Sequence, residues 1–470
     1  MSRMISKSKY LAGLQCPKLL WTHYNDKEQL PETGAATQAI FDQGHEVGRL
    51  AQSLFPGGTE VAWSDDFGAM LRSTQDMLAP RRPLYEATFG AAGVFARADI
   101  LHPVEDGCWD VIEVKSSTAV KDVHLNDVAV QRYCYEAAGV PVRKCYLMHI
   151  NNQYVRHGAV DAQGLLTAED VTDAVAKILP TVAPKIAEMQ QVLAQETCPV
   201  VEVGPHCDNP YSCPLKEQCW AERWEAEAAV QPANELRCDC LAVRRFMDGL
   251  VYPLHLLDFE TFMTAIPRFD NSRPYRQIPF QFSLHVVETL DQPPKHHSWL
   301  WDGVGDPRSI MLAELRKVIG ATGSVMAYNK TFEERCIKES AAAFPEHAEF
   351  VADLMTRMVD LANPFRSHAV YQSMQQGRWS LKVVLPAYTR KGYDDLAIGD
   401  GGTASAEFMR VMFADADPAD RENVRNNLEE YCSLDTSGML DLLRYLEGMS
   451  NRRVIEAIRM GTHRSCLESD

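Results

Sequence analysis

The sequence predicts an α/β protein with two mixed domains, each built from a sheet flanked by helices. Runs of apolar residues with a period of two alternate along the chain with longer runs of period near 3.6. The length of 470 residues exceeds that of one ordinary domain. An Ala/Glu/Arg-rich helical stretch at 221–250 separates two such regions. We expect a first domain over 1–225, a connector over 226–250, a second domain over 251–450 and a C-terminal tail over 451–470.

The elements of the first region follow from periodicity and from glycine and proline positions. A helical pattern stops before the Pro-Gly-Gly sequence at 56–58, and the turn 105–107 divides two strand patterns. The expected elements are a helix over 36–54, strands over 84–90, 93–104 and 108–117, a helix over 122–139, a strand over 142–150 and a long helix over 168–197.

The second region begins with the apolar strand pattern LHLLDFETF at 254–262. A further strand is expected at 323–329, followed by several helices to about residue 447. The sequence shows no internal repeat and no low-complexity tract.

Composition limits the class of protein. Hydrophobic residues make up 46% and charged residues 24%, which are ordinary globular values. No run of about 18 apolar residues is present, so no membrane contact is expected. The N-terminus lacks the apolar core of a secretory signal, so we expect a cytoplasmic protein. In a reducing cytoplasm we do not expect the 13 cysteines to form structural disulfides, and clustered cysteines indicate metal or cluster ligation.

A net charge of −17 argues against a protein that coats nucleic acid without specificity. It does not exclude a nuclease, because metal-dependent nucleases gather carboxylates whose charge divalent cations offset. A nucleic-acid groove would then need a local basic patch, for which the candidates are Lys7, Lys9, Lys18, Arg81 and Arg82.

The first constellation lies in the strand 108–117. Glu113 and Lys115 are two residues apart, so both side chains project from one face. A hairpin would bring Asp99 beside Glu113. Two carboxylates suit Mg²⁺ or Mn²⁺, and the lysine would position the attacking water or stabilise developing charge. The alternative interpretation is a salt-bridge network on an exposed strand.

The order Asp99, Glu113-Val-Lys115, Gln131 and Tyr135 resembles the PD-(D/E)xK nuclease superfamily, in particular its RecB-like branch. The resemblance implies a restriction-endonuclease-like core with a mixed sheet flanked by helices. It also implies a metal-ligating histidine on an upstream helix, matched by His45, and an extra acid before the central hairpin, matched by Glu86. Gln131 and Tyr135 are one helical turn apart, and the resemblance implies that they are catalytic residues near the active site and the nucleic acid.

A cysteine set follows, with Cys207, Cys213 and Cys219 at even spacing. Three cysteines leave a zinc site one ligand short, and Cys16 is the candidate for the fourth. One N-terminal and three C-terminal cysteines around such a core resemble the iron–sulfur nucleases of the CRISPR-adaptation and AddB-like groups. The resemblance implies a 4Fe-4S cluster, with zinc as the alternative. Spare candidates are Cys198, Cys238 and Cys240, and we interpret Cys108, Cys134, Cys145, Cys336 and Cys432 as buried free cysteines.

The second constellation begins with Asp258 and Glu260, again two apart in an apolar strand. Farther along stand Glu333, four residues after Asn329, and the helical pair Tyr431 and Asp435. This order resembles the DEDD exonuclease superfamily, which has an RNase H-like fold. The resemblance implies that the four acids hold two metal ions and that Tyr431 orients the water.

One position departs from that pattern, because the second acid is normally Asp and here is the longer Glu333. The nearby Asp360 we interpret as a helix-capping or core-edge residue.

Both halves together resemble a bacterial family that fuses a RecB-like nuclease to a DEDD-type domain. We therefore expect a metal-dependent deoxyribonuclease using Mg²⁺ or Mn²⁺, acting as an exonuclease on single-stranded DNA or free ends in DNA repair or defence. One alternative is a nucleic-acid-binding scaffold with inactive or partly inactive sites. Another is an RNA exonuclease driven by the second domain.

Overall fold

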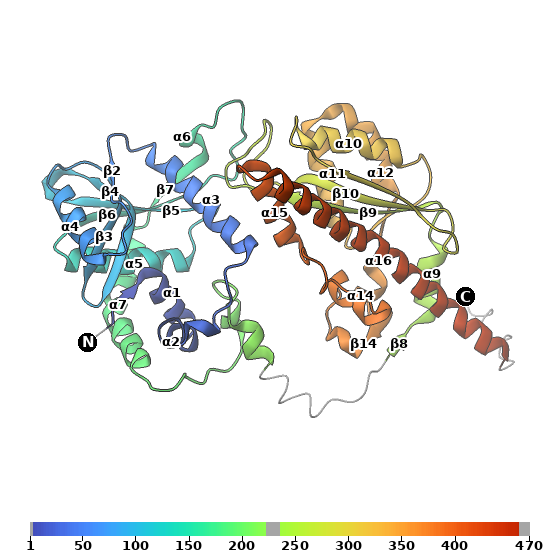
Figure 1. Ribbon diagram of the computed structural model, residues 1–470, viewed down its shortest axis with the longest axis horizontal. Coiled ribbons are helices and arrows are strands. Elements are labelled where there is room, and N and C mark those ends of the chain that lie inside the picture. The colour runs from blue at the N-terminus through green and yellow to red at the C-terminus, as the bar shows by residue number, and fades with distance from the viewer. Residues whose placement is uncertain (1–2, 222–235, 460–470) are drawn as a thin grey trace. The chain divides into compact units, whose positions relative to one another are not determined.

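The computed structural model describes residues 3–221 and 236–459, which form two compact mixed α/β units (Figure 1). The N-terminal unit comprises Met1–Thr33, Ile40–Gln231 and Thr264–Tyr275. The C-terminal unit comprises Gly34–Ala39, Pro232–Met263 and Arg276–Asp470. The α/β class agrees with the sequence prediction. The division differs from the predicted boundaries in two short segments. Gly34–Ala39 belongs to the C-terminal unit, and Thr264–Tyr275 belongs to the N-terminal unit.

The sheet of the N-terminal unit has the order β2-β3-β4-β5-β6-β7, with β1 paired in parallel to β4. The strands β3, β4 and β5 are antiparallel neighbours, whereas β5 and β6 are parallel and are joined through helix α5. The strand bounds are Ile5–Ser6 (β1), Thr59–Glu60 (β2), Leu84–Ala91 (β3), Val94–Pro103 (β4), Trp109–Lys115 (β5), Val142–Ile150 (β6) and Leu166–Asp170 (β7).

Alternation along β5 decides which helices its side chains meet. Trp109 and Val111 lie in the core shared with α1, α5 and α7, whereas Ile112 and Val114 lie in a second core shared with α3. Glu113 and Lys115 have the parity of Val111, so they face α5. The helices are Lys7–Gln15 (α1), Pro17–Asn25 (α2), Ala35–Gln52 (α3), Phe67–Leu78 (α4), Asp122–Ala137 (α5), Ala162–Leu165 (α6) and Thr172–Leu193 (α7).

Residues 264–275 extend the second core of the N-terminal unit. Ala265 packs with the α3 residue Val47, and its backbone N–H donates a 2.9 Å hydrogen bond to Oε1 of Gln43. The Tyr275 hydroxyl donates to the carbonyl of Ser116, directly after β5. A loop that lies between two strands of the other unit's sheet in sequence therefore supports the end of β5.

The C-terminal unit has a five-stranded sheet of order β11-β10-β9-β12-β13. The pairs β11–β10 and β10–β9 are antiparallel, and the pairs β9–β12 and β12–β13 are parallel. A separate two-stranded sheet pairs β14 with β8. The strand bounds are Leu236–Cys238 (β8), Leu254–Phe262 (β9), Ile278–Val287 (β10), Lys295–Leu300 (β11), Val325–Ala327 (β12), Met358–Asp360 (β13) and Val370–Gln372 (β14).

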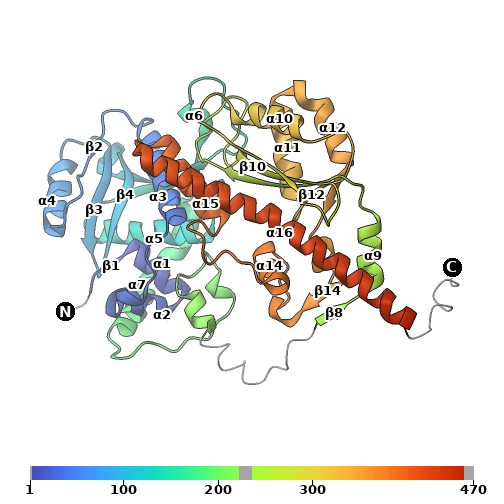
Figure 2. The ribbon, with the colours of Figure 1, turned by 45° about the vertical axis from the view of Figure 1, so that its right-hand side comes forward.

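Alternation again separates the two faces of this sheet. Leu257 and Phe259 of β9 pack in a core with α10, α11 and α12. Asp258 and Glu260 therefore project from the opposite face, along which the long helix α16 runs (Figure 2). The helices are Cys240–Asp248 (α9), Pro307–Val318 (α10), Thr331–Ala343 (α11), Ala348–Thr356 (α12), Asn363–Arg366 (α13), Leu381–Thr389 (α14), Gly401–Phe413 (α15) and Pro418–Arg459 (α16).

Three sequence predictions need correction in their bounds. The expected helix 168–197 begins later, because residues up to Asp170 pair with β6 as β7 and the helix starts at Thr172. The expected connector contains the strand β8 before helix α9, while residues 222–235 lie outside the described part. The expected tail is helical to Arg459 as a continuation of α16, and residues 460–470 are not described.

The short 3₁₀ helices of both units are Lys27–Gln29, Glu105–Gly107, Pro205–Cys207, Pro345–His347 and Ser373–Gln375. Across residues 3–221 and 236–459, every helix is too short or too polar to cross a lipid bilayer.

Candidate functional site

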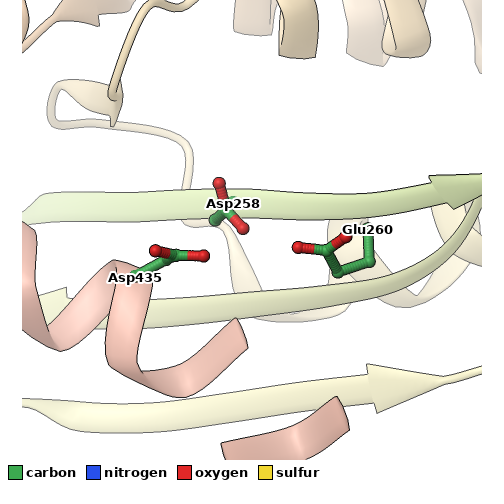
Figure 3. A group of neighbouring side chains, drawn as sticks. All are labelled: Asp258, Glu260 and Asp435. Carbon is green, nitrogen blue, oxygen red and sulfur yellow. The ribbon is translucent and has the colours of Figure 1, made fainter. Parts of the chain in front are cut away.

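The described residues contain one group of three acidic, histidine or cysteine side chains placed closely enough to share a metal ion. Asp258 and Glu260 come from β9 and Asp435 from α16, and one oxygen of each lies within 4.8 Å of the others. The three side chains point into a common space (Figure 3). Glu260 and Asp435 are each 6% exposed and Asp258 is half-buried, so solvent reaches the group beside Asp258.

Burial raises the pKa of each of these carboxyls, and repulsion by neighbouring acids raises the pKa values of Asp258 and Glu260 further. The pKa of Asp258 lies well above its usual range because of burial and then the charges of Asp435 and Glu260. The pKa of Glu260 is likewise raised well above its usual range by burial and by Asp435. Burial raises the pKa of Asp435 to about 6. A bound divalent cation would relieve this repulsion, and oxygen donors are the ligands that Mg²⁺ and Mn²⁺ prefer.

Glu333, the sequence-predicted second acid, lies in the first turn of α11 and is 3% exposed. Its Oε2 is buried, and no described residue offers that oxygen a hydrogen bond. Burial first, and then the charges of Asp360 and Asp435, raise the pKa of Glu333 to about 8. A buried carboxylate oxygen without a partner is unusual in a native fold. Either a proton or a cation would satisfy it, but Glu333 is not one of the acids that lie within 4.8 Å of one another.

Two tyrosines stand over Asp435. The predicted Tyr431 lies one turn before it on α16 and is 3% exposed. Tyr393 was not predicted, and its hydroxyl donates a hydrogen bond to Oδ1 of Asp435. The two rings meet edge to face with centroids 5.9 Å apart. Tyr393 follows α14 in a loop with no catalytic motif around it, so no sequence signal indicated its role.

Lys382 is a further unpredicted residue of this site. Its ammonium lies 5.2 Å from the ring centroid of Tyr393 and 5.1 Å from that of Tyr431. It donates a 2.6 Å hydrogen bond to the carbonyl of Gly399. Its positive charge lowers the pKa values of Glu260 and Asp435, against the larger effect of burial.

Two nearby residues have structural roles. Asp360, interpreted as a helix-capping or core-edge residue, caps neither α11 nor α13 and lies at the buried end of β13. It accepts hydrogen bonds from the backbone N–H groups of Asn329 and Ala362 and pairs with Arg366. Cys432, predicted to be a buried free cysteine, places its Sγ 3.6 Å from Oδ2 of Asp258. It therefore packs directly beneath one of the carboxylates.

The N-terminal constellation forms at the point where β4 and β5 separate. Their pairing ends at Ile100 and Ile112, and Oδ2 of Asp99 then accepts a 2.7 Å hydrogen bond from the backbone N–H of Val114. Glu113 is 1% exposed, and its Oε1 lies 2.5 Å from Nζ of Lys115. Asp99, Glu113 and Lys115 are therefore brought together, as predicted.

The structure adds Lys7 and Asp127 to this network. Nζ of Lys7 lies 2.9 Å from Oε1 of Glu113 and 4.0 Å from Oδ1 of Asp99. Oδ2 of Asp127, on α5, lies 2.6 Å from Nζ of Lys115. Lys7 was considered only for a basic patch. Asp127 was missed, although it precedes Gln131 by one helical turn, a spacing that puts both side chains on one face of α5.

Gln131 and Tyr135 hold Glu113 from behind. Nε2 of Gln131 donates a 2.7 Å hydrogen bond to Oε2 of Glu113, and the Tyr135 hydroxyl donates a 2.9 Å hydrogen bond to Oε1 of Gln131. Both side chains are fully buried. They were predicted as catalytic residues, but both are buried, and their hydrogen bonds hold the Glu113 carboxylate in place.

His45 and Glu86 are not gathered with Asp99 and Glu113 in the same way. His45 is exposed on α3, which packs on the face of the sheet opposite to Glu113, and it makes no hydrogen bond with the described residues. Glu86 adopts a left-handed backbone conformation (φ 56°) in β3 and lies 3.4 Å from Nε of Arg97. Neither side chain is placed to share a metal ion with the two acids.

The predicted basic patch is only partly available for binding. Arg81 donates to the carbonyls of Gly107 and Cys108 and lies over the ring of Trp109, so it holds a turn in place. Nζ of Lys9 lies 2.8 Å from Nδ1 of His23, so its ammonium is already engaged within the protein. Lys7 is the member of the proposed patch that reaches the carboxylate network.

The four predicted cluster cysteines lie together. Cys16, Cys207 and Cys213 share one small apolar core, and Cys219 packs against it. Burial raises the pKa values of Cys16 and Cys213, and the nearby cysteines raise them further. The structure therefore gathers four thiols from distant parts of the chain, although no three of their sulfurs lie within 4.8 Å of one another.

The remaining cysteines divide as follows. The predicted buried cysteines Cys134, Cys145, Cys336 and Cys432 are buried and free, and Cys108 is half-buried. Of the spare candidates, Cys238 and Cys240 approach each other, with their sulfurs 2.9 Å apart. Cys198 is half-buried and free.

Comparison with known proteins places one family over this site. The family described as Domain of unknown function (DUF2779) matches residues 255–380, which include Asp258, Glu260 and Glu333. An uncharacterised protein of Mycoplasma genitalium is 25% identical over 211 residues, 41% of this chain and 32% of that protein. An uncharacterised protein of Ureaplasma parvum is 25% identical over 205 residues, 39% of this chain and 29% of that protein. The chain thus covers about a third of the length of these relatives.

Proposed function

We propose that the chain is a metal-dependent nuclease that hydrolyses phosphodiesters at the ends of single-stranded nucleic acid, with DNA as the preferred polymer. The observation that carries the proposal is the group of Asp258, Glu260 and Asp435, whose oxygens lie within 4.8 Å of one another on a buried sheet face. The unpartnered Oε2 of Glu333 supports it, because that carboxylate contributes to the same electrostatic environment. Such a set is costly to the fold unless a cation binds there.

The strand order supports an RNase H-like assignment for the C-terminal unit. Three antiparallel strands, β9, β10 and β11, are followed by two that run parallel to β9, in the order β11-β10-β9-β12-β13. This is the arrangement of RNase H-like domains, in which the first strand carries the first two acids. In the N-terminal unit, the separation of β4 and β5 beside Asp99 and Glu113 supports a PD-(D/E)xK-like core.

The residues of the C-terminal unit would divide the work as follows. Asp258, Glu260, Glu333 and Asp435 would hold the divalent metal, which when bound lowers the pKa of water and neutralises phosphate charge. Tyr393 keeps Asp435 oriented through its hydroxyl. Tyr431 would orient the attacking water, and its burial beside Asp435 keeps bulk solvent away from that position.

The N-terminal network would form a second hydrolytic site. Asp99 and Glu113 would hold a metal ion that, when bound, activates water, and Lys115 would stabilise the charge that develops on the phosphate. Lys7 and Lys115 now compensate the charge of Glu113. A metal ion would have to compete with Lys7 for that oxygen, so we assign the main activity to the C-terminal unit.

The cysteine set would hold a 4Fe-4S cluster. No three of these four sulfurs lie within 4.8 Å of one another. Tetrahedral zinc with Zn–S bonds of about 2.3 Å would bring its sulfurs to about 3.8 Å. Such a cluster would tie Cys16 of the N-terminal segment to the segment 207–219.

The test is hydrolysis of end-labelled single strands of DNA and RNA in Mn²⁺, for wild type, Asp258→Asn, Glu113→Gln and the control Asp291→Asn. Asp291 is exposed in the C-terminal unit, away from the acids. We expect Asp258→Asn to reduce the rate by about a thousandfold, equivalent to about 4 kcal/mol of transition-state stabilisation. Faster RNA cutting would reassign the polymer. Wild type that cuts neither polymer would leave a binding scaffold as the better description.

A further inference from the structure

Lys382 is a cation beside the group of acids, yet its ammonium forms no salt bridge with an acid among the described residues. Its ammonium is held by the carbonyl of Gly399 and by the faces of Tyr393 and Tyr431. Among the described residues it forms no salt bridge, although Glu260 and Asp435 are near enough for its charge to act on them. One carbonyl and two aromatic rings therefore fix the position of the Lys382 ammonium, and none of them carries a negative charge.

This environment suits a lysine that binds an anionic ligand. Aromatic faces and one carbonyl restrain the side chain without cancelling its charge, which reduces the conformational entropy lost when a ligand binds. Lys382 is half-buried, so part of the ammonium remains accessible. A bound metal ion would compensate the carboxylates, so the charge of Lys382 would then be available to an anionic ligand.

We propose that Lys382 is a phosphate-binding residue that contacts a non-bridging oxygen of the nucleic-acid strand next to the metal-ligating acids. The proposal rests on the function proposed above, since it needs a strand in the site. It assigns to Lys382 a contact that the sequence motifs do not include. Tyr393 and Tyr431 serve as the support that keeps the ammonium in place.

The competing explanation is that Lys382 only offsets the charge of the acids in the folded protein. The two explanations differ in what a neutral side chain changes. If Lys382 binds phosphate, Lys382→Met weakens strand binding and removes one counterion from the salt dependence of binding. If it only offsets charge, Lys382→Met lowers the thermal midpoint of the metal-free protein and leaves strand binding unchanged.

The experiment measures the Kd of a labelled DNA single strand by fluorescence anisotropy in Ca²⁺ over a series of salt concentrations. The proteins are wild type, Lys382→Met, Lys382→Arg and the control Lys317→Met. Lys317 lies on α10 and pairs with Glu314 on the surface, so it matches the charge change away from the site. Thermal midpoints and hydrolysis rates in Mn²⁺ are recorded for the same samples.

We expect Lys382→Met to raise Kd about tenfold, the value of one charge-assisted hydrogen bond. The slope of log K against log salt should fall in magnitude by about 0.7, as for one lost phosphate contact on a single strand. Lys382→Arg should retain most of the affinity, and Lys317→Met should match wild type.

An unchanged Kd and slope for Lys382→Met, with wild type binding and cutting the strand, would overturn this inference alone. Wild type that neither binds nor cuts would overturn the proposed nuclease function and this inference together. The two failures are therefore distinguishable from one set of samples.

Discussion

The side-chain amide of Gln131 donates a hydrogen bond of 2.7 Å to Oε2 of Glu113, joining helix α5 to the centre of strand β5. Tyr135 continues the chain of hydrogen bonds one turn farther into the core. A carboxylate that is 1% exposed would otherwise have one oxygen facing apolar side chains. These hydrogen bonds explain how the apolar strand β5 accommodates the buried carboxylate of Glu113.

Replacement of Tyr135 by Phe should destabilise β5 and α5, because Oε1 of Gln131 loses its hydrogen-bond donor inside the core. The expected cost is about 1–3 kcal/mol. Native-state hydrogen exchange of the amides in β5 and α5, read by mass spectrometry, reports this free energy in the full chain. Tyr211→Phe is the control, since Tyr211 is exposed. Equal protection in Tyr135→Phe and wild type would contradict the chain of hydrogen bonds.

Replacement of Lys115 by Met should destabilise the N-terminal unit more strongly, by about 3–5 kcal/mol. The change leaves Glu113 and Asp127, both nearly buried, with one fewer cation between them. The double variant Lys115→Met/Asp127→Asn should recover part of the loss. Lys144→Met is the control, because the pair of Lys144 with Asp170 is exposed and worth at most about 1 kcal/mol. An equal loss in the single and double variants would count against the network.

The metal-free protein should lose stability as the pH rises from about 5 to about 8. The pKa of Asp435 is raised to about 6 and that of Glu333 to about 8, both mainly by burial. Carboxyls whose folded pKa exceeds the unfolded one bind more protons in the folded state, so stability falls as pH passes through the folded pKa. The measurement is the thermal midpoint in EDTA across this range.

Mn²⁺ should reverse this trend, since it binds the ionised carboxylates and stabilises them increasingly as pH rises. Asp435→Asn should flatten the profile in EDTA and weaken the response to Mn²⁺. A wild-type midpoint in EDTA that rises between pH 6 and pH 8 would show that the pKa values of these carboxyls are not raised in the folded protein.

Replacement of Cys213 by Ser should remove the visible absorption expected of an iron–sulfur cluster after anaerobic purification. Cys213 lies in the same small core as Cys16 and Cys207. Cys145→Ser is the matched control, because Cys145 is also buried but lies in the main core of the N-terminal unit. Iron and zinc are quantified in each sample. Absorption that survives in Cys213→Ser, or wild type that holds neither metal, would count against the site.

The strands β5 and β9, which carry candidate site acids, were predicted from the sequence, because period-two alternation is a local property. Glu113 with Lys115, and Asp258 with Glu260, follow directly from it. The motif spacing also led to Tyr431 and Asp435. The place of residues 264–275 was not predicted, because nothing local indicates that a loop between two strands of the C-terminal sheet belongs to the N-terminal unit.

The supporting residues were missed for a related reason. Asp127, Tyr393 and Lys382 reach their sites through tertiary packing, and each stands in a stretch with no distinctive pattern. His45 was expected from resemblance to join the first site, yet α3 presents it on the surface. Burial of Val47 and Ala51 on the same helix fixes that orientation.

The central claim is that Asp258, Glu260 and Asp435 hold a catalytic divalent cation. The most direct measurement is the number of Mn²⁺ ions bound, by electron paramagnetic resonance titration of wild type, Asp258→Asn and Glu113→Gln at pH 8. We predict that wild type binds Mn²⁺ and that Asp258→Asn loses at least one ion that Glu113→Gln retains. Wild type that binds no Mn²⁺, or Asp258→Asn that binds as many ions as wild type, would contradict the claim.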